Sequence, residues 1–487
     1  MPRLSDLLKS LAPGYRVNGP TDIELSAITA DSRRVTDGAL FVAIKGTGVD
    51  GHDFINAAVK AGARAVVGSH MPDGLPDTVT TIIVDDPATA LGRLASRWYG
   101  DPSRSLRLVG VTGTNGKTTV ATLIYEISRL YGLRAGLLST VVNIVDTERV
   151  AATHTTPGPI ELNSLLRRMV DAGCEIAAME VSSHAADQHR IAGLHFAGGI
   201  FTNLTRDHLD YHKTFDAYLR AKQSFFDMLR TEAFALTNAD DRNGAVMVQN
   251  TRGRVFDYSV RADADFRGRI IENRLDGMLI SFNGTEVETL FTGRFNASNL
   301  TAVYGAATLL GFDSERLPQA MSALVPVAGR FQTFRSSSGI TAIVDYAHTP
   351  DALINVLDTI RDIVGRGSQH LITVCGCGGD RDRGKRPMMA AAAASRSDRL
   401  ILTSDNPRSE DPVAIIDDML AGLDDEARRT TLSITDRREA IRTAAALARP
   451  GDVILVAGKG HEDYQIIGSE RHHFDDREEV QAALGII

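Results

Sequence analysis

The sequence predicts an α/β protein made of three successive units, and three observations lead to this prediction. The chain has 487 residues, which at roughly 100–200 residues per domain corresponds to three or at most four domains. Short apolar runs of strand length alternate with helix-like stretches, a pattern typical of parallel sheets covered by helices on both faces. A glycine-rich turn also follows one such strand and opens a helix, which is the context of a phosphate-binding loop.

We expect the first unit to span residues 1–105. It contains β-like runs at 39–44, 65–67 and 81–84, followed by a helix-like segment at 88–98. The turn-forming sequence Tyr-Gly-Asp-Pro-Ser at 99–103 then suits a linker.

The second unit is expected to span residues 106–330. A buried strand at 106–111, the glycine-rich turn and a helix at 117–131 open it, and further strands are predicted at 175–181 and 198–202. Residues 264–294 differ, because short alternating segments and the pair Asn283-Gly284 favour antiparallel hairpins. A helix is predicted at 299–310.

The third unit is expected to span residues 331–487. Its predicted strands lie at 340–344, 371–374, 400–402 and 453–456, with helices between them. This pattern indicates a second open α/β sheet, in which the loops at the carboxyl ends of the strands carry the chemistry.

Composition and charge limit the possible functions. Hydrophobic residues make up 43% of the chain and charged residues 23%, which is ordinary for a globular protein and excludes a disordered or collagenous one. The 53 basic and 61 acidic residues give a net charge of −8, so the basic footprint of a nucleic-acid-binding protein is missing. A few local cations could still bind an anionic substrate.

The three cysteines and the N-terminal sequence point to a reducing compartment. Cys375 and Cys377 form a C-x-C without a second pair, so we expect small buried residues at a strand end and no zinc site. The first residues lack the continuous apolar core of a signal peptide, and no run of about 18 apolar residues occurs. We therefore expect a cytoplasmic protein without membrane insertion.

The strongest functional signal is Gly-Val-Thr-Gly-Thr-Asn-Gly-Lys-Thr-Thr at residues 110–119. Backbone N–H groups of such a loop can surround phosphate oxygens, and the helix N-terminus adds a positive field. Lys117 would reach the β- and γ-phosphates, and the Thr118 hydroxyl would bind Mg²⁺. Val111 departs from the strict motif, which has glycine there, so a simple glycine-rich turn is the alternative. The loop alone indicates nucleotide dependence, because kinases, motor ATPases, GTPases and ligases share it.

The form of this loop resembles that of the Mur ligases and their folylpolyglutamate synthase relatives. Other segments follow in the order of that family along nearly the whole chain: Glu-Val-Ser-Ser-His at 180–184, Thr-Asn-Leu-Thr-Arg-Asp-His-Leu-Asp-Tyr-His at 202–212, Lys222, Asn-Ala-Asp-Asp at 238–241, Phe-Asn-Ala-Ser-Asn at 295–299, Gly-Arg at 329–330 and Asp-Tyr-Ala-His-Thr-Pro at 345–350. The resemblance implies an N-terminal UDP-binding domain, a central ATP-binding domain and a C-terminal Rossmann-like domain that binds an amino acid.

Within the family, Ser-Asp-Asn-Pro-Arg at 404–408 is similar to a motif that recognises diaminopimelate. Members that add lysine lack the arginine of this motif. Gly-Cys-Gly-Gly-Asp-Arg-Asp at 376–382 and Gly-Lys-Gly-His-Glu-Asp-Tyr at 458–464 match the same members. The implied reaction is ATP-dependent, ADP-forming amide synthesis through an acyl phosphate. It joins meso-2,6-diaminopimelate to the D-Glu of UDP-N-acetylmuramoyl-L-alanyl-D-glutamate, in peptidoglycan precursor synthesis. The alternatives are a lysine-adding ligase, a folylpolyglutamate synthase-like ligase, a phosphate-loop kinase and a non-catalytic scaffold.

The resemblance also implies roles for individual residues. Expected contacts to ATP are Gly113, Thr114, Asn115, Gly116, Lys117, Thr118, Thr119, Asn299, Arg330 and Asp345. Expected contacts to the UDP-linked dipeptide are Ser32, Gly48, Val49, Asp50, His154, Thr155, Thr156, Ser182, Gln188 and Arg190. His154 stands where relatives often have asparagine, and Asn299 could instead cap a helix that starts near it. Simple turn or cap chemistry is the alternative for the Ser and Thr residues.

Two Mg²⁺ sites would neutralise the anions that converge in this reaction. Thr118 and Glu180 resemble ligands of one ion, and His208 resembles a ligand of the second. The catalytic set implied is Lys117, Glu180, His208 and Lys222. A satisfied strand-end carboxylate and a structural histidine are the alternatives for Glu180 and His208.

Lys222 carries the most specific expectation. An ammonium cannot bind a cation, but a carbamate formed from the neutral amine and CO₂ has oxygens that can hold Mg²⁺. The resemblance implies such a carbamate, whereas the sequence alone would suggest a solvated helix residue.

The incoming amino acid is expected in the third unit. The second amino-acid head of diaminopimelate carries a carboxylate and an ammonium. Its pocket therefore needs cations to bind the carboxylate and an acidic side chain to bind the ammonium. The residues expected there are Arg381, Asp405, Asn406, Pro407, Arg408, Gly458 and Glu462. We expect a monomer whose three units close on the substrates.

Overall fold

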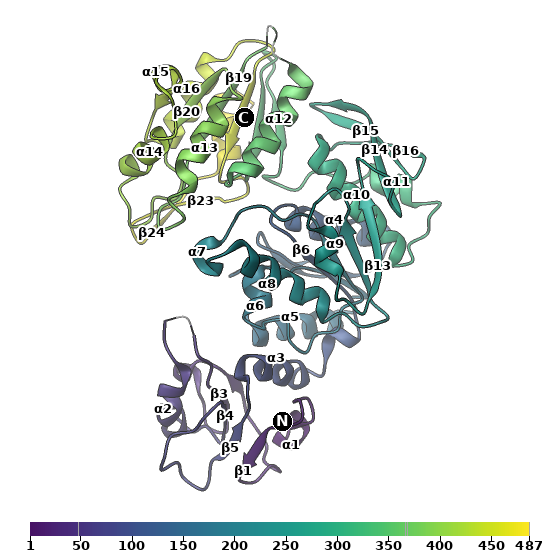
Figure 1. Cartoon of the computed structure of the whole chain (residues 1–487), viewed down its shortest axis with the longest axis vertical. Helices are drawn as coiled ribbons and strands as arrows, with labels where there is room; N and C mark the ends of the chain where they lie inside the picture. The colour runs from purple at the N-terminus through teal and green to yellow at the C-terminus, as the bar shows by residue number, and fades with distance from the viewer. Residues whose placement is uncertain (47, 366, 368, 487) are drawn as a thin grey trace.

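The computed structural model describes residues 1–46, 48–365, 367 and 369–486. Three α/β parts follow one another along the long axis of the molecule (Figure 1), with the N-terminal part at one end and the C-terminal part at the other. The predicted fold class is therefore confirmed. No helix in the described ranges is long and apolar enough to span a membrane.

The N-terminal part is a five-stranded sheet of order β1-β5-β4-β3-β2. Only β1 runs antiparallel to its neighbour. The elements are β1 (Arg16–Asn18), β2 (Ile28–Thr29), β3 (Leu40–Val42), β4 (Ala65–Gly68), β5 (Thr80–Ile83), α1 (Leu4–Leu8), α2 (Ile55–Lys60) and α3 (Pro87–Trp98). Asp86 caps α3 by accepting from two backbone N–H groups, and Pro87 suits the first helical position because it needs no hydrogen-bond partner there.

The central part is built on an eleven-stranded sheet of order β16-β15-β14-β13-β12-β11-β6-β10-β7-β8-β9. Its strands are β6 (Arg107–Thr112), β7 (Ala135–Leu138), β8 (Asn143–Val145), β9 (Glu148–Val150), β10 (Ile176–Glu180), β11 (Gly198–Phe201), β12 (Phe234–Asn238), β13 (Arg254–Ser259), β14 (Phe266–Arg274), β15 (Gly277–Phe282) and β16 (Thr285–Thr289). Its helices are α4 (Lys117–Leu130), α5 (Pro159–Asp171), α6 (Ser183–Asp187), α7 (Leu209–His212), α8 (Phe215–Asp227), α9 (Gly244–Val248), α10 (Arg294–Leu309) and α11 (Leu317–Ser322).

Strand β6 lies in the middle of this sheet, parallel to β10 on one side and β11 on the other. Separate apolar clusters fill the two faces, so the strands are buried on both sides. The carboxyl ends of these three strands, which carry the predicted phosphate loop and Glu180, therefore meet at one edge. The predicted hairpins form β14–β16, with Asn283-Gly284 at their turn.

The C-terminal part has a six-stranded sheet of order β17-β18-β22-β19-β20-β21 and a separate hairpin, β23–β24. The elements are β17 (Gln332–Arg335), β18 (Thr341–Asp345), β19 (Leu371–Cys375), β20 (Arg399–Leu402), β21 (Leu432–Ser433), β22 (Val453–Ala457), β23 (Tyr464–Ile467), β24 (Glu470–His473), α12 (Pro350–Val364), α13 (Lys385–Ala394), α14 (Pro412–Leu420), α15 (Asp425–Thr430), α16 (Arg437–Leu447) and α17 (Asp476–Ala483).

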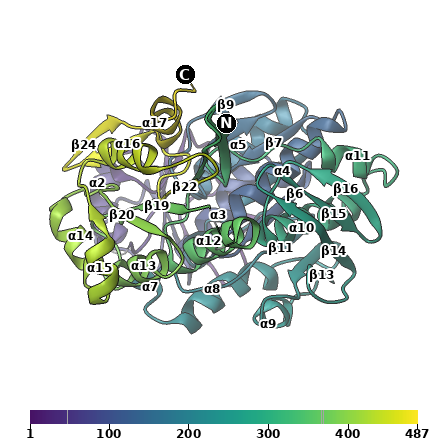
Figure 2. The ribbon, with the colours of Figure 1, turned by 90° about the horizontal axis from the view of Figure 1, so that it is seen from above.

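Helices α12, α13 and α14 cover one face of the C-terminal sheet, while α16 and α17 cover the other (Figure 2). Cys375 ends β19, and both it and Cys377 are buried free thiols, as expected. Residues at the carboxyl ends of β18, β19, β20 and β22 face the site described next.

Candidate active site

The glycine-rich loop joins β6 to α4 with very little free space around its backbone. Gly113 has φ 152° and Gly116 has φ 86°, values that residues with a side chain rarely adopt. A Cβ atom on Gly113 would lie 1.9 Å from Oγ1 of Thr202, and one on Gly116 would lie 2.5 Å from Oδ1 of Asn299. The loop therefore requires glycine at both positions. This confirms the predicted context, a strand followed by a tight loop and a helix.

Two lysines donate to the same carbonyl oxygen of this loop. Nζ of Lys222 lies 2.7 Å from the Gly113 oxygen, and Nζ of Lys117 lies 3.0 Å from it. Lys222 is only 1% exposed, so the alternative of a solvated helix residue is wrong. Burial and the neighbouring Lys117 charge lower the pKa of Lys222 well below its usual value. Burial also lowers the pKa of Lys117.

Hard oxygen donors gather beside this loop. Oγ1 of Thr118 donates to Oε1 of Glu180 at 2.9 Å, and the backbone N–H of Thr140 donates to the same oxygen at 2.7 Å. Glu180 is 1% exposed at the end of β10. A hydroxyl and a buried carboxylate suit Mg²⁺. Among the described residues no group of three or more His, Cys, Asp or Glu could hold a metal. A Mg²⁺ ion bound here would therefore also need hydroxyl, phosphate, carbamate or water oxygens.

His208 lies in the loop that precedes α7, with a left-handed backbone at φ 53°. Its Nε2 lies 3.4 Å from Oδ2 of Asp207, and its ring is 4.9 Å from that of His184. Burial lowers the pKa of His208 to about 4, so the imidazole is neutral at physiological pH and can bind a cation. Within the described ranges it forms no hydrogen bond to Thr118, Glu180 or Lys222.

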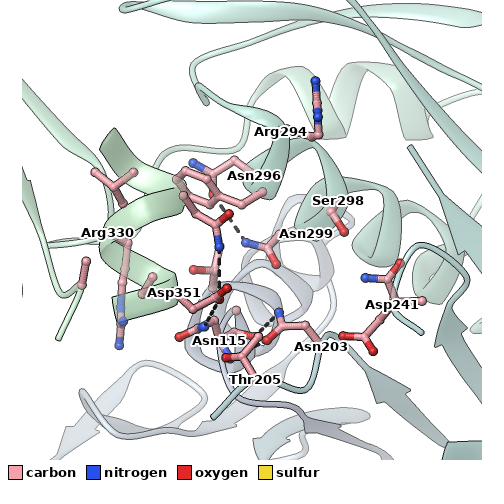
Figure 3. Close-up of a pocket in the computed structure, with 18 of the residues that line it drawn as sticks. Asn115, Asn203, Thr205, Asp241, Arg294, Asn296, Ser298, Asn299, Arg330 and Asp351 are labelled. Carbon is pink, nitrogen blue, oxygen red and sulfur yellow. Dashed lines mark hydrogen bonds between the residues drawn. The ribbon is translucent and has the colours of Figure 1, made fainter. Parts of the chain in front are cut away.

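A cavity of about 280 Å³ lies between the central and C-terminal parts (Figure 3). Asn115, Gly116 and Thr119 of the loop line it together with Asn299, Arg330 and Asp345. The other expected nucleotide contacts, Gly113, Thr114, Lys117 and Thr118, are not among its lining residues. Nη2 of Arg330 donates to Oγ1 of Thr118 at 3.2 Å. The same guanidinium lies 4.4 Å above the Tyr346 ring.

The suggested capping role of Asn299 is wrong. Helix α10 begins at Arg294, five positions before the predicted start, and Gly293 occupies the cap position. Asn299 thus lies in the second turn of the helix, where its side chain faces Gly116 and the cavity.

Most residues expected to hold the peptide of the UDP-linked substrate form one network next to Glu180. Oγ1 of Thr156 donates to the backbone oxygen of Glu180 at 2.8 Å and accepts from the N–H of Ser182 at 3.1 Å. Arg190 donates to the Thr156 carbonyl at 2.8 Å and to Oε1 of Gln188 at 2.7 Å.

The other expected contacts to this substrate are less enclosed. Thr155 accepts a hydrogen bond from Oγ1 of Thr140 at 3.1 Å, whereas His154 is exposed. In the N-terminal part, Asp50 accepts from the backbone N–H of His52, and Val49 is 61% exposed. Ser32 begins a short 3₁₀ turn that Asp31 caps. Ser182 caps α6, as the turn-and-cap alternative for the Ser and Thr residues allows, and Asp50 caps a short 3₁₀ turn.

The residues expected to bind the amino acid converge on a lysine that sequence reasoning missed. Nζ of Lys459 lies 3.3 Å from Oε2 of Glu462, 3.7 Å from Oδ1 of Asp405 and 3.2 Å from Oδ1 of Asn406. Nδ2 of Asn406 also donates to Oε2 of Glu462 at 2.8 Å. Burial raises the pKa of Glu462.

Arg408 and the exposed Arg381 both lie near Gly378. Arg408 follows Pro407 in a left-handed conformation with φ 52° and donates to the Gly379 carbonyl at 2.7 Å. A Cβ atom on Gly378 would lie 2.9 Å from Nη1 of Arg408 and 3.8 Å from Cγ of Arg381. Gly458, at φ 122°, lies beside Asp405.

The linker between the central and C-terminal parts lies directly on the Gly458–Glu462 loop. A Cβ atom on Gly329 would be 2.1 Å from the backbone N of His461 and 2.2 Å from the backbone C of Gly460. The ring of His461 lies 4.8 Å from that of Tyr346. Nothing but glycine fits at Gly329 without moving the loop.

Sequence reasoning also missed residues that complete the site. Asn203 donates to and accepts from Asn115 through its side chain, and Asp351 of α12 accepts from Asn115 at 3.5 Å (Figure 3). Three of the missed residues lie inside or next to segments that resemble the family, and this location could have identified them: Asn203, Asp351 and Tyr346. Thr140 lies in a segment without a motif, so nothing in the sequence indicated its contact with Glu180.

Comparison with known proteins agrees with this site. Three family models match the chain: "Mur ligase family, catalytic domain" at residues 24–99, "Mur ligase middle domain" at 111–307 and "Mur ligase, glutamate ligase domain" at 329–460.

Curated relatives match over almost the full length. A UDP-N-acetylmuramoyl-L-alanyl-D-glutamate–2,6-diaminopimelate ligase of Bacteroides fragilis is 56% identical over 99% of both chains. Its counterpart from Phocaeicola vulgatus is 57% identical over 97% of this chain and 98% of its own. A solved structure of a ligase with the same name is 34% identical with a TM-score of 0.70, covering 99% of both chains. The chain belongs to the Mur ligase family.

Proposed function

We propose that this protein is the ATP-dependent, ADP-forming ligase that adds meso-2,6-diaminopimelate to UDP-N-acetylmuramoyl-L-alanyl-D-glutamate in peptidoglycan precursor synthesis. The observation that carries the proposal is the meeting of three groups at one sheet edge. These are the phosphate loop, the buried Glu180 carboxylate and the Thr156–Arg190 network. Relatives named for this reaction at 56–57% identity support it over the lysine-adding and folylpolyglutamate alternatives.

The first chemical step transfers the γ-phosphoryl group of ATP to the D-Glu side-chain carboxylate, forming an acyl phosphate and ADP. Loop N–H groups and Lys117 would hold the phosphates, and Arg330 would approach them from the linker, since it already touches Thr118. Arg190 and Thr156 would fix the dipeptide so that its carboxylate lies in line with the phosphoryl group. Mg²⁺, when bound near Thr118 and Glu180, would supply charge neutralisation.

We further propose that Lys222 acts as a carbamate. Its neutral amine would attack CO₂, form an N–C bond and release one proton, leaving an anion with two oxygens. The buried position beside Lys117 favours the neutral amine that this addition requires. The carbamate would keep one N–H for the Gly113 carbonyl, and its two oxygens could hold a cation. His208 would bind a second Mg²⁺ ion, for which its neutral imidazole is suited.

The second step is attack of the acceptor amine on the acyl carbon, with loss of phosphate from a tetrahedral intermediate. Arg408 and Arg381 would bind the carboxylate of the acceptor's distal head. Glu462 would accept from its ammonium, and Asp405, Asn406 and the Gly458 carbonyl would complete the pocket.

We assign residues 1–105 to the UDP end, 106–330 to ATP and the acyl transfer, and 331–487 to the acceptor. We propose a cytoplasmic monomer, because ATP is supplied there and one chain holds every expected contact.

One assay tests the proposal. The protein is given ATP and the UDP-linked dipeptide, and phosphate release is measured with diaminopimelate, with lysine and without acceptor. We expect release with diaminopimelate only. Arg408→Ala should raise KM for diaminopimelate far more than KM for ATP, because it removes the guanidinium proposed to bind the acceptor's distal carboxylate. Equal release with lysine, or release that needs no dipeptide, would overturn the assignment.

A further inference from the structure

The candidate amino-acid pocket contains one buried cation among its acidic groups. The side chain of Lys459 is 0% exposed, and its Nζ lies within 3.7 Å of three oxygen atoms from Asp405, Asn406 and Glu462. The ring of Tyr464 lies 5.4 Å from the same nitrogen. A buried ammonium is stable only when paired and hydrogen-bonded, and these contacts supply both conditions.

The contacts fix the orientation of the neighbouring amide. Oδ1 of Asn406 accepts from Lys459 at 3.2 Å and from the backbone N–H of Ile466 at 2.9 Å. Its Nδ2 must then be the end that donates to Oε2 of Glu462 at 2.8 Å. A flipped amide would place two donors against Lys459 and Ile466.

The same contacts leave one side of the Glu462 carboxylate open. Oε2 receives both protein donors, from Asn406 and Lys459. No group in the described ranges donates to Oε1. A carboxylate held by two donors on one oxygen presents its other oxygen in a defined direction.

We propose that Lys459 is a positioning residue that determines specificity for an acceptor with a second amino-acid head. It holds Glu462 ionised and Asn406 in one orientation, so that the free Glu462 oxygen can accept a hydrogen bond from the acceptor's distal ammonium. Asp405 also has the buried Arg437 guanidinium near it, whereas Lys459 is the cation that offsets Asp405 at Glu462. Without Lys459, Glu462 would face the Asp405 carboxylate uncompensated and would take up a proton more readily. A protonated Glu462 would no longer attract an ammonium. This inference rests on the proposed function.

The test uses Lys459→Met in the full-length protein, because methionine keeps an unbranched chain as far as the Cε position and removes the ammonium. We expect KM for diaminopimelate to rise about 10-fold to 100-fold, as for loss of one partner of a buried charge pair. KM values for ATP and the UDP-linked dipeptide should stay within about twofold. Acyl-phosphate formation, trapped with hydroxylamine in the absence of acceptor, should keep its wild-type rate. An unchanged KM for diaminopimelate would overturn the proposal, and so would an equal rise for all three substrates.

A double-mutant cycle separates positioning from a general packing role. Glu462→Gln removes the charge that Lys459 is inferred to hold, so Lys459→Met should cost much less in a Glu462→Gln background. Additive effects would contradict the inference, and this comparison holds even if each variant is less stable. Failure of the wild-type protein to release phosphate with diaminopimelate would refute the proposed function. A normal wild-type enzyme with a normal Lys459→Met variant would refute only the role of Lys459.

Discussion

Lys222 and Lys459 are both buried, yet their surroundings are opposite. Lys222, 1% exposed, has a backbone carbonyl at 2.7 Å and shares it with the ammonium of Lys117. Lys459, 0% exposed, has two carboxylates within 3.7 Å. Burial disfavours a charge in both places, but among the described residues only Lys459 has carboxylates within salt-bridge distance, whereas Asp207 acts on Lys222 from farther away. The comparison teaches that neighbours, and not burial alone, decide whether a lysine serves as an amine or as a cation.

The largest expected effect concerns Lys222, which among the described residues has no carboxylate within salt-bridge distance. Lys222→Met should lower kcat about 10³-fold, because it removes the proposed carbamate and its contribution to cation binding. Acetate or formate should partly restore phosphate release by supplying carboxylate oxygens. Wild-type activity should fall when CO₂ and bicarbonate are removed, while the residual activity of the variant should not respond. An unmodified amine at Nζ of Lys222 in the electron density of active, CO₂-equilibrated protein would contradict the carbamate.

A buried ion pair behind Gly458 tests how much a compensating anion contributes to stability, because Nη2 of Arg437 would lie 3.9 Å from a Cβ atom on that glycine. Nε and Nη2 of Arg437 each lie 2.7 Å from a carboxylate oxygen of Asp476, and both side chains are 0% exposed. Asp476→Ala should lower the free energy of unfolding by about 3 kcal/mol, because it strands a buried guanidinium. Urea denaturation measures this effect. Glu439→Ala, which removes an exposed partner of Arg442, is the control and should change stability by less than about 1 kcal/mol. Equal losses would mean that burial of the pair is unimportant.

Crowding in the phosphate loop predicts a smaller, site-specific effect. Gly116→Ala should raise KM for ATP about tenfold, because the new Cβ meets Asn299 at 2.5 Å and φ is 86°. Gly132→Ala is a matched control with φ 79° and no atom within 4 Å of the added Cβ. That variant should lose some stability and keep its KM. A similar rise of KM for ATP in both variants would mean that backbone strain, and not the contact with Asn299, causes the effect.

The smallest expected effect is on the pH dependence of stability and comes from His195, which lies near two arginines. Burial, Arg230 and Arg104 lower the pKa of His195 to about 4 against the opposing charges of Asp101 and Glu232. The folded state thus binds this proton less readily than the unfolded state, so stability is lost as pH falls from about 6.5 to about 4. His195→Gln should reduce that loss by less than about 1 kcal/mol, since the ring is partly exposed. Thermal unfolding between pH 7 and 4 measures it, and an identical pH dependence in both proteins would contradict the assignment.

Much of the fold could be predicted because apolar runs end at turn residues. The strand predicted at 371–374 is Leu371–Cys375, and the helix predicted at 117–131 is Lys117–Leu130. The start of α10 was misplaced because Asn296 and Asn299 look like polar cap residues. They are helical residues whose amides face a cavity, which only the tertiary structure reveals.

Site residues could be predicted where a sequence motif determines the local backbone conformation, as in the phosphate loop. Contacts between segments that are distant in the sequence could not be predicted in this way. The burial of Lys222 depends on Gly113, 109 positions away, and α8 has charged neighbours that suggest exposure. Lys459 stands between two glycines, as a loop lysine would. Its role depends on contacts that Asp405, Asn406 and Glu462 make only in the folded sheet.

The contact between Gly329 and Gly460 has a consequence for the order of events during turnover. The linker and the acceptor loop touch without room for one added carbon, so we expect them to move together in any domain motion. Arg330, the next residue, reaches Thr118 of the phosphate loop. A swing that carries the acceptor toward the acyl carbon must therefore also displace this guanidinium relative to the nucleotide. The Gly329–Gly460 contact would thus couple delivery of the acceptor amine to the position of Arg330 at the phosphates.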